Sequence, residues 1–237
     1  MTRRLLLLAT LGLLLLGCGE DSVTTQVFPV QAPLPAQERA VYRVLDRNGA
    51  QIGRAVFTIE PDAGRVRFIQ EYEFGAGERD RLTVLLDPLS LRPLHSAREV
   101  HDRGMTYLTE AVYEEAAVAV TFRDGRGERT RRAGISDSTY DNLESLVLWR
   151  TLEMAPGAKV SYGNVIVDPR RGTINRALGT VTVAGKETLT LPAGMIEAWR
   201  LDFRAAGLIN RAWYAATPDR RLLRYEIARG PVLELEP

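Results

Sequence analysis

The chain has 237 residues, of which 45% are hydrophobic and 26% charged, a composition typical of a globular protein that buries a core. Its 31 basic and 30 acidic residues nearly cancel, which excludes the strong basic excess of many nucleic-acid-binding proteins, and only Lys159 and Lys186 are lysines. The single cysteine, Cys18, excludes an internal disulfide and a multi-cysteine metal site.

The first segment has the pattern of an export signal. Arg3 and Arg4 precede an apolar stretch, Leu5 to Leu16, that is shorter than the roughly 20 residues a membrane-spanning helix needs. The sequence Leu15-Leu16-Gly17-Cys18 resembles a bacterial lipobox, in which the cysteine receives a diacylglyceryl group before cleavage. We therefore predict that residues 1–17 are a cleaved signal peptide and that Cys18 carries palmitate-type acyl chains. The alternative is an ordinary signal peptide with an incidental cysteine.

Acylation of Cys18 would anchor the protein to membrane lipid in the cell envelope. If the cell has two membranes, the residue that follows, Gly19, favours the outer membrane, with the protein facing the periplasm; otherwise we expect the cell surface. Residues 18–38 lack periodicity and contain several prolines, so we interpret them as a lipidated N-terminus and flexible tether. The alternative is that Phe28 and Val30 pack onto the domain.

From residue 40 onward the hydrophobic pattern has a period of two, which indicates strands. Asn48-Gly49 predicts a tight hairpin between the first two strands, and Asp87-Pro88, Arg103-Gly104 and residues 124–127 predict later turns. Short turns at this spacing favour an antiparallel meander over alternating strands and helices. The predicted strands in this part of the chain are 40–46, 55–59, 66–74, 80–86, 94–101, 105–114 and 116–123.

One segment departs from the strand pattern. Apolar residues recur at helical spacing over 141–152, with Asp141 placed to cap the helix and Glu144 placed to reach back. We predict a helix there, packed on the sheet through a side that includes Trp149 rather than contacting a cofactor. Strands resume at 159–167 and 174–183, residues 184–186 are interpreted as a turn, and the last predicted strands are 195–204, 208–216 and 222–229. Residues 39–237 are thus expected to form one β-rich domain.

Several short motifs in order resemble those of an uncharacterised family of bacterial envelope lipoproteins. They are Gly49-Ala50-Gln51-Ile52-Gly53, Asp87 to Pro93, Val183 to Glu187, Leu191-Pro192-Ala193-Gly194, Ala198-Trp199-Arg200 and Arg211-Ala212-Trp213-Tyr214 followed by Pro218. The family is similar in layout to the Lol-type lipoprotein carriers. The resemblance implies a mainly β fold, a single strongly curved antiparallel sheet that forms an unclosed barrel with one helix packed on or in its concave face. It implies no catalytic residues.

A direct search for chemistry finds little. His95 and His101 are six residues apart, which on a regular strand separates them by about 20 Å, too far for a two-histidine metal site. Arg129, Arg131 and Arg132 lack interleaved aromatic residues and are interpreted as a solvated hairpin tip. Nucleophile and phosphate-binding motifs are missing from the sequence. We expect no enzyme activity, no cofactor, no metal site and no nucleic-acid partner.

Two functions of different class are compatible with the sequence. In the first, the protein is a non-catalytic binding module for a lipid or other hydrophobic ligand. In the second, it is a structural or assembly protein that docks envelope proteins without a small ligand. The alternative for the aromatic residues themselves is plain core packing. The predicted apolar ligand face comprises Tyr72, Tyr107, Tyr113, Trp149, Trp199 and Trp213.

Overall fold

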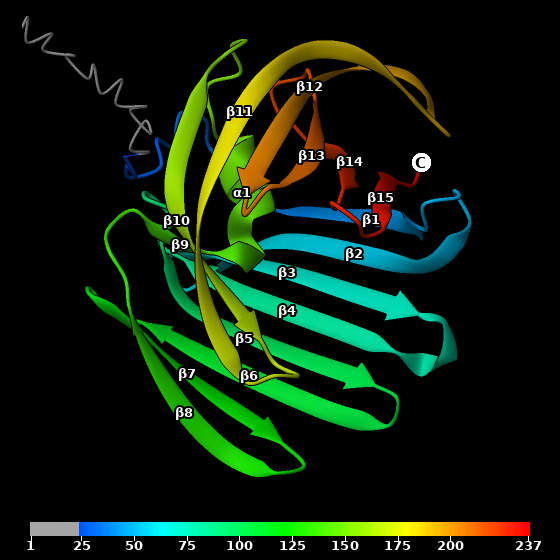
Figure 1. Cartoon of the computed structure of the whole chain (residues 1–237). Coiled ribbons are helices and arrows are strands. Elements are labelled where there is room, and N and C mark those ends of the chain that lie inside the picture. Colours follow the sequence, from blue (N-terminus) through cyan, green and yellow to red (C-terminus); the bar gives the residue numbers. More distant parts are fainter. Residues whose placement is uncertain (1–23) are drawn as a thin grey trace, which may run out of the picture.

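A computed structural model describes residues 24–237, so the predicted signal peptide and Cys18 lie outside the described residues. The described chain forms one unclosed sheet of fifteen strands with a single short α-helix, which confirms the predicted fold class. Figure 1 shows the sheet curling around this helix, α1, with the early strands forming one wall and the later strands the other. Among residues 24–237, no helix is long and apolar enough to cross a bilayer.

The first wall consists of eight strands and the second of seven. The first-wall strands are β1 (Glu38–Leu45), β2 (Gln51–Asp62), β3 (Arg65–Phe74), β4 (Arg79–Leu86), β5 (Pro93–Asp102), β6 (Met105–Tyr113), β7 (Ala117–Asp124) and β8 (Gly127–Gly134). The second-wall strands are β9 (Thr139–Asp141), β10 (Lys159–Asp168), β11 (Thr173–Leu191), β12 (Gly194–Ala205), β13 (Leu208–Ala215), β14 (Leu222–Glu226) and β15 (Val232–Leu235). The short helices are η1 (Gly75–Gly77), η2 (Asn142–Glu144) and α1 (Ser145–Arg150).

Apart from β8 and β9, strands that are consecutive in the sequence are neighbours in the sheet, as a meander requires. The order runs from β8 back to β1, then to β15, and back again from β15 to β9. Pairing of β1 with β15 joins the two walls, and β8 and β9 are left as the unjoined edges. All pairings between described strands are antiparallel except that of β9 with β10.

The core lies between the two walls and around α1. All six residues of α1 are buried, and its apolar side chains belong to the largest hydrophobic cluster together with Tyr42, Phe57 and Phe203. Trp149 packs against Phe203 with ring centroids 4.8 Å apart and donates a 2.7 Å hydrogen bond to the Tyr162 hydroxyl. The prediction that Trp149 packs in the core is therefore confirmed.

The predicted helix is present but shorter than expected. Asp141 and Glu144 form a reciprocal capping box, as predicted, but they cap η2, and α1 ends at Arg150 rather than at residue 152. The last carbonyls of the helix are satisfied without a further helical turn, because the Thr151 hydroxyl donates to the Leu148 carbonyl and the Arg220 guanidinium donates to the Arg150 and Leu152 carbonyls. The Arg150 side chain closes its end by pairing with Glu38, and both side chains are less than 10% exposed.

Four local predictions were wrong. Arg129, Arg131 and Arg132 lie along the edge strand β8 instead of at a hairpin tip. Residues 184–186 do not turn the chain, because β11 continues to Leu191 and the irregularity at Val183/Gly185 is a shift in its pairing with β12. The predicted strand 222–229 ends at Glu226, and a separate β15 follows it. A short β9 precedes the helix where no strand was predicted.

The predicted tether is also incorrect for residues 24–37. Phe28 is only 2% exposed and belongs to the main core, and Val30 packs against it. The backbone amide of Gln26 donates to the Ser161 carbonyl, and that of Gln31 donates to the Thr151 carbonyl. The alternative from the sequence, in which Phe28 and Val30 pack onto the domain, is what the structure shows.

Candidate functional site

A cavity of about 330 Å³ lies inside the curved sheet, beside the start of the helical segment. Alternate residues of the first wall face it, because side chains on a strand point to opposite sides in turn. Gln70, Leu82, Ser145 and Leu146 are buried, Asn142 is exposed, and the other lining residues are half-buried. The lining residues are Gln70, Tyr72 and Phe74 of β3, Asp80 and Leu82 of β4, Arg98 of β5, Asn142 and Leu143 of η2, Ser145 and Leu146 of α1, Asn210 of β13, Tyr225 of β14, and Ile227 and Pro231.

The cavity exists because the start of the helical segment packs less closely against the first wall than the rest of α1 does. Farther along α1, apolar side chains such as Val147 pack directly toward Phe57 and Phe68, and the space left there is only about 20 Å³. At the start of the helix, polar groups intervene. Tyr72 donates a 2.8 Å hydrogen bond to Gln70, and the Gln70 amide donates to the Leu143 carbonyl. This hydrogen-bonded chain bridges sheet and helix and leaves room beside it.

An ion pair lies on the inner side of the sheet at the cavity. The Arg98 guanidinium donates to both carboxylate oxygens of Asp80, at 2.9 and 2.6 Å. The two side chains are 21% and 17% exposed, so the pair is largely removed from water. Two-point geometry of this kind fixes both side chains. Because each charge already has its partner, the cavity offers a ligand oriented polar groups but no uncompensated charge.

A buried acidic cluster flanks the cavity behind η2. Asp141 accepts 2.6 Å hydrogen bonds from the Ser96 and Tyr113 hydroxyls and a 3.0 Å bond from the Leu143 amide. Burial raises the pKa of Asp141, and burial together with the nearby Asp141 carboxyl raises the pKa of Glu144 well above its usual value. These interactions fix Asn142 and Leu143, which lie between the two acids and line the cavity.

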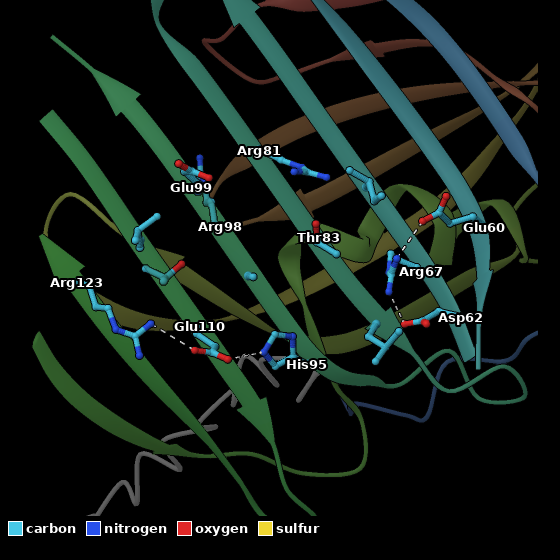
Figure 2. A pocket seen from close by; sticks show the side chains of 15 residues that line it. Glu60, Asp62, Arg67, Arg81, Thr83, His95, Arg98, Glu99, Glu110 and Arg123 are labelled. Atoms are coloured by element: carbon cyan, nitrogen blue, oxygen red, sulfur yellow. Dashed lines mark hydrogen bonds and ion pairs between the residues drawn. The ribbon is translucent and has the colours of Figure 1, made fainter. Parts of the chain in front are cut away.

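A second, larger hollow of about 580 Å³ lies on the opposite, outer side of the first wall. Its lining residues on β4, Arg81, Thr83 and Leu85, alternate with the buried Leu82, Val84 and Leu86. Figure 2 shows charged side chains across it, with Arg67 between Glu60 and Asp62 at one side and Glu110 between His95 and Arg123 at the other. The hydrogen bond from His95, together with Arg123, lowers the pKa of Glu110.

The structure does not bring the six predicted ligand-face residues together. Tyr72 alone lines the interior cavity. Tyr113 lies on the same inner side of the sheet but is bonded to Asp141, and the Tyr107 hydroxyl contacts the sulfur of Met105 in an exposed position.

The three tryptophans lie elsewhere. Trp149 is in the main core. Trp199 is half-buried beneath the Lys186 ammonium, which lies 5.0 Å from its ring centroid. Trp213 belongs to a separate small cluster and donates a hydrogen bond to Glu187. A continuous aromatic face would have required these residues to share one side of adjacent strands, and they do not.

Sequence reasoning missed the polar residues of the cavity. Asp80 and Arg98 occupy inward positions in strands where inward neighbours such as Leu82, Val84 and Val100 are buried and apolar. A charge at a core position of an alternating strand, matched by an opposite charge on a nearby strand, was the available signal.

The two histidines contact different carboxylates. His95 contacts Glu110 at 3.1 Å and His101 contacts Glu99 at 2.8 Å, and all four residues are partly exposed. Among residues 24–237 no group of three or more His, Cys, Asp and Glu side chains is arranged to hold a metal ion.

Comparison with known proteins gives a family and one distant structural likeness. A family model described as "Protein of unknown function (DUF3108)" matches residues 39–232. A crystal structure of a "putative lipoprotein" from Parabacteroides distasonis aligns with 90% of this chain and 99% of its own, at 10% sequence identity and a TM-score of 0.32. No curated protein matches the chain.

Proposed function

The chain belongs to this family of unknown function, and we propose that it is a lipid-anchored protein of the bacterial cell envelope that binds a small, largely apolar ligand in the cavity beside η2. The anchor rests on the lipobox-like sequence that ends at Cys18. The binding role rests on one observation, the 330 Å³ cavity between the helix and the inner side of the sheet.

The lining supports a ligand with an apolar body and one or two neutral hydrogen-bonding groups. Phe74, Leu82, Leu143 and Leu146 supply apolar surface. The Asn210 side chain and the Tyr225 hydroxyl supply polar contacts on the facing wall. A volume near the lower end of the range for ligand pockets favours a small ligand or a single acyl chain over a whole phospholipid.

We propose a non-catalytic role for this site. The Asp80 carboxylate is held by Arg98, and the Tyr72 hydroxyl is already engaged with Gln70. Groups in these states orient a bound molecule but are poorly placed to transfer protons or to attack it.

The proposal is tested by native mass spectrometry with lipid extraction. The full chain would be isolated from a bacterium that acylates it, with Leu143→Trp as the cavity-filling variant and Met195→Trp as the control, because Met195 is 76% exposed at a remote hairpin. We expect a stoichiometric apolar adduct, in addition to the covalent acyl chains, in the parent and the control and its loss in Leu143→Trp. A clean mass for the parent after challenge with envelope lipids would refute ligand binding.

The outer hollow favours a second candidate function, docking of another envelope protein. Its floor contains neutral side chains such as Ile69, Ala97 and Leu108, and its rim carries ion-paired charges, which is the usual layout of a protein interface. Crosslinking from the rim to one partner protein, with loss on Ala97→Arg, would support this function. Crosslinks that survive Ala97→Arg would exclude this hollow as the interface.

A further inference from the structure

The packed N-terminal segment determines how far the domain can stand from its membrane. The first described residue, Thr24, is six residues after Cys18, and a fully extended chain of that length spans about 20 Å. A tether that continued to residue 38 would have allowed more than three times that reach. The end of the domain where Thr24 lies is therefore held close to the bilayer if Cys18 is acylated, a condition that belongs to the proposed function.

Contacts identify which end of the domain this is. The Ser138 hydroxyl bonds to Thr25, and its neighbour Asp137 pairs with Arg92 at 3.0 Å. Arg92 closes the connection between β4 and β5, so the N-terminal segment lies beside that connection. We call this the anchor end. Antiparallel pairing places the β2–β3 and β6–β7 connections at the same end, and Figure 1 shows the N-terminal segment on the side opposite the β3–β4 connection.

The anchor end carries an apolar surface. Leu89, in the β4–β5 connection, is 84% exposed, the highest value for a large hydrophobic side chain among residues 24–237. Close to it in the chain, Pro88 and Leu91 line a hollow of about 270 Å³ formed with the N-terminal segment. Apart from Glu60 and Arg65, its lining residues are apolar, and they include Pro33, Pro35, Pro61 and Val66.

The half-buried lining residues of the interior cavity lie mainly toward the other end, which places its mouth there. Phe74 and Asp80, which line the cavity, flank the β3–β4 connection, and Gln70 and Leu82 lie deeper. From Val66 to Phe74 the strand β3 rises about 26 Å. The apolar hollow and the cavity mouth are therefore separated by most of the length of the wall.

We propose that the apolar surface of the anchor end, centred on Leu89, rests on the bilayer that holds Cys18, with the cavity opening away from it. A bilayer fits this surface because the six-residue connection brings the two together and an exposed apolar surface is favourably buried at the lipid interface. Ligand in the cavity then exchanges on the side away from the anchoring membrane.

The test uses the acylated full chain in vesicles of three parts phosphatidylethanolamine to one part phosphatidylglycerol. A fluorophore is attached at Glu115→Cys, in the exposed β6–β7 connection of the anchor end, or at Arg47→Cys, in the exposed β1–β2 connection of the far end. Quenching by nitroxide-labelled lipid headgroups reports distance from the bilayer. We expect several-fold stronger quenching at Glu115→Cys, and equal quenching at both sites would overturn the proposal.

A second comparison separates the effect of the apolar surface from the effect of the short connection to Cys18. Twenty Gly/Ser residues inserted after Asp21 release the constraint, and we expect Glu115→Cys to remain the more strongly quenched site because the apolar surface itself favours the bilayer. Loss of the difference in this lengthened chain would overturn a docking surface. Leu89→Asp in the lengthened chain should abolish the difference in quenching between the two sites. A difference that persisted in this variant would overturn the role of Leu89. Failure of acylation would be recognised separately, because the intact mass of the protein would then lack the acyl chains.

Discussion

The backbone amide of Phe28 donates a 3.0 Å hydrogen bond to the hydroxyl of Tyr140, a residue 112 positions later in the chain. Their rings meet edge to face with centroids 6.1 Å apart. The N-terminal segment is thereby tied to the strand that leads into the helix. A stretch that looks like a linker in the sequence is part of the structure that holds the helix in place.

Phe28→Ala should lower the free energy of unfolding by about 3–5 kcal/mol, the usual cost of removing a fully buried aromatic ring. Urea denaturation of a Cys18→Ser chain that begins at residue 18 measures it. Val27→Ala is the matched control, since Val27 is 54% exposed and its truncation should change stability by less than about 0.5 kcal/mol. Equal, small effects of the two substitutions would mean that the segment is not part of the core.

Cys18→Ala should move the protein from the membrane fraction to the soluble envelope fraction without unfolding it. Each buried methylene of an acyl chain contributes about 0.8 kcal/mol, so loss of two or three chains removes nearly all membrane affinity. Fractionation with immunodetection, with circular dichroism on the released protein, reports both properties. A membrane fraction unchanged by the substitution would contradict the lipobox interpretation.

The fold class followed from the sequence because strand alternation and turn residues are local signals. Asn48-Gly49 and Arg103-Gly104 each joined the strands they were expected to join. The errors arose where distant residues decide the outcome. Nothing near Phe28 in the sequence indicates that it will pack against Tyr140. Nothing near Gly185 indicates that β11 will continue through the irregularity in its pairing with β12.

The candidate site was harder to predict than the fold. Aromatic residues were chosen for their chemistry, yet of the six only Tyr72 lines the cavity. Tyr113 is bonded to Asp141 and Trp149 is enclosed in the core, so an inward position alone does not place a side chain at the cavity. Asp80 and Arg98 are eighteen residues apart, and only the pairing of β4 with β5 brings them together. Such pairs depend on register, which the local pattern of either strand does not fix.

Glu144→Gln should flatten the dependence of stability on pH. Burial and the Asp141 carboxyl raise the pKa of Glu144 well above 4.5, so the folded state holds this proton more tightly than the unfolded chain does. The stabilising effect is complete below about pH 4.5 and is lost as the pH rises through the folded pKa, at up to about 1.4 kcal/mol per pH unit.

Glutamine keeps an oxygen to accept from the Asp141 amide and cannot ionise. The slope of the free energy of unfolding against pH should therefore become less steep between pH 5 and 8. The part of the slope that is due to Asp141 should remain, because the pKa of Asp141 is also raised. Urea denaturation at five pH values measures this dependence. Glu153→Gln, at an exposed position near the end of the helix, is the control and should leave the slope unchanged. A slope identical in Glu144→Gln and the parent would exclude Glu144 as the titrating group.

Arg98→Met should destabilise the protein more than the double variant Arg98→Met/Asp80→Leu does. Removal of the guanidinium leaves a mostly buried carboxylate without its partner, which costs up to about 3–5 kcal/mol in fully buried pairs and less at the partial exposure of this one. Replacing both members with apolar side chains removes that penalty. Urea denaturation of the parent, both single variants and the double variant gives the coupling energy. Retention of the ligand shows which role the ion pair has. If the pair only supports the cavity, the double variant should keep the apolar adduct. Loss of the adduct at recovered stability would show that Arg98 or Asp80 contacts the ligand.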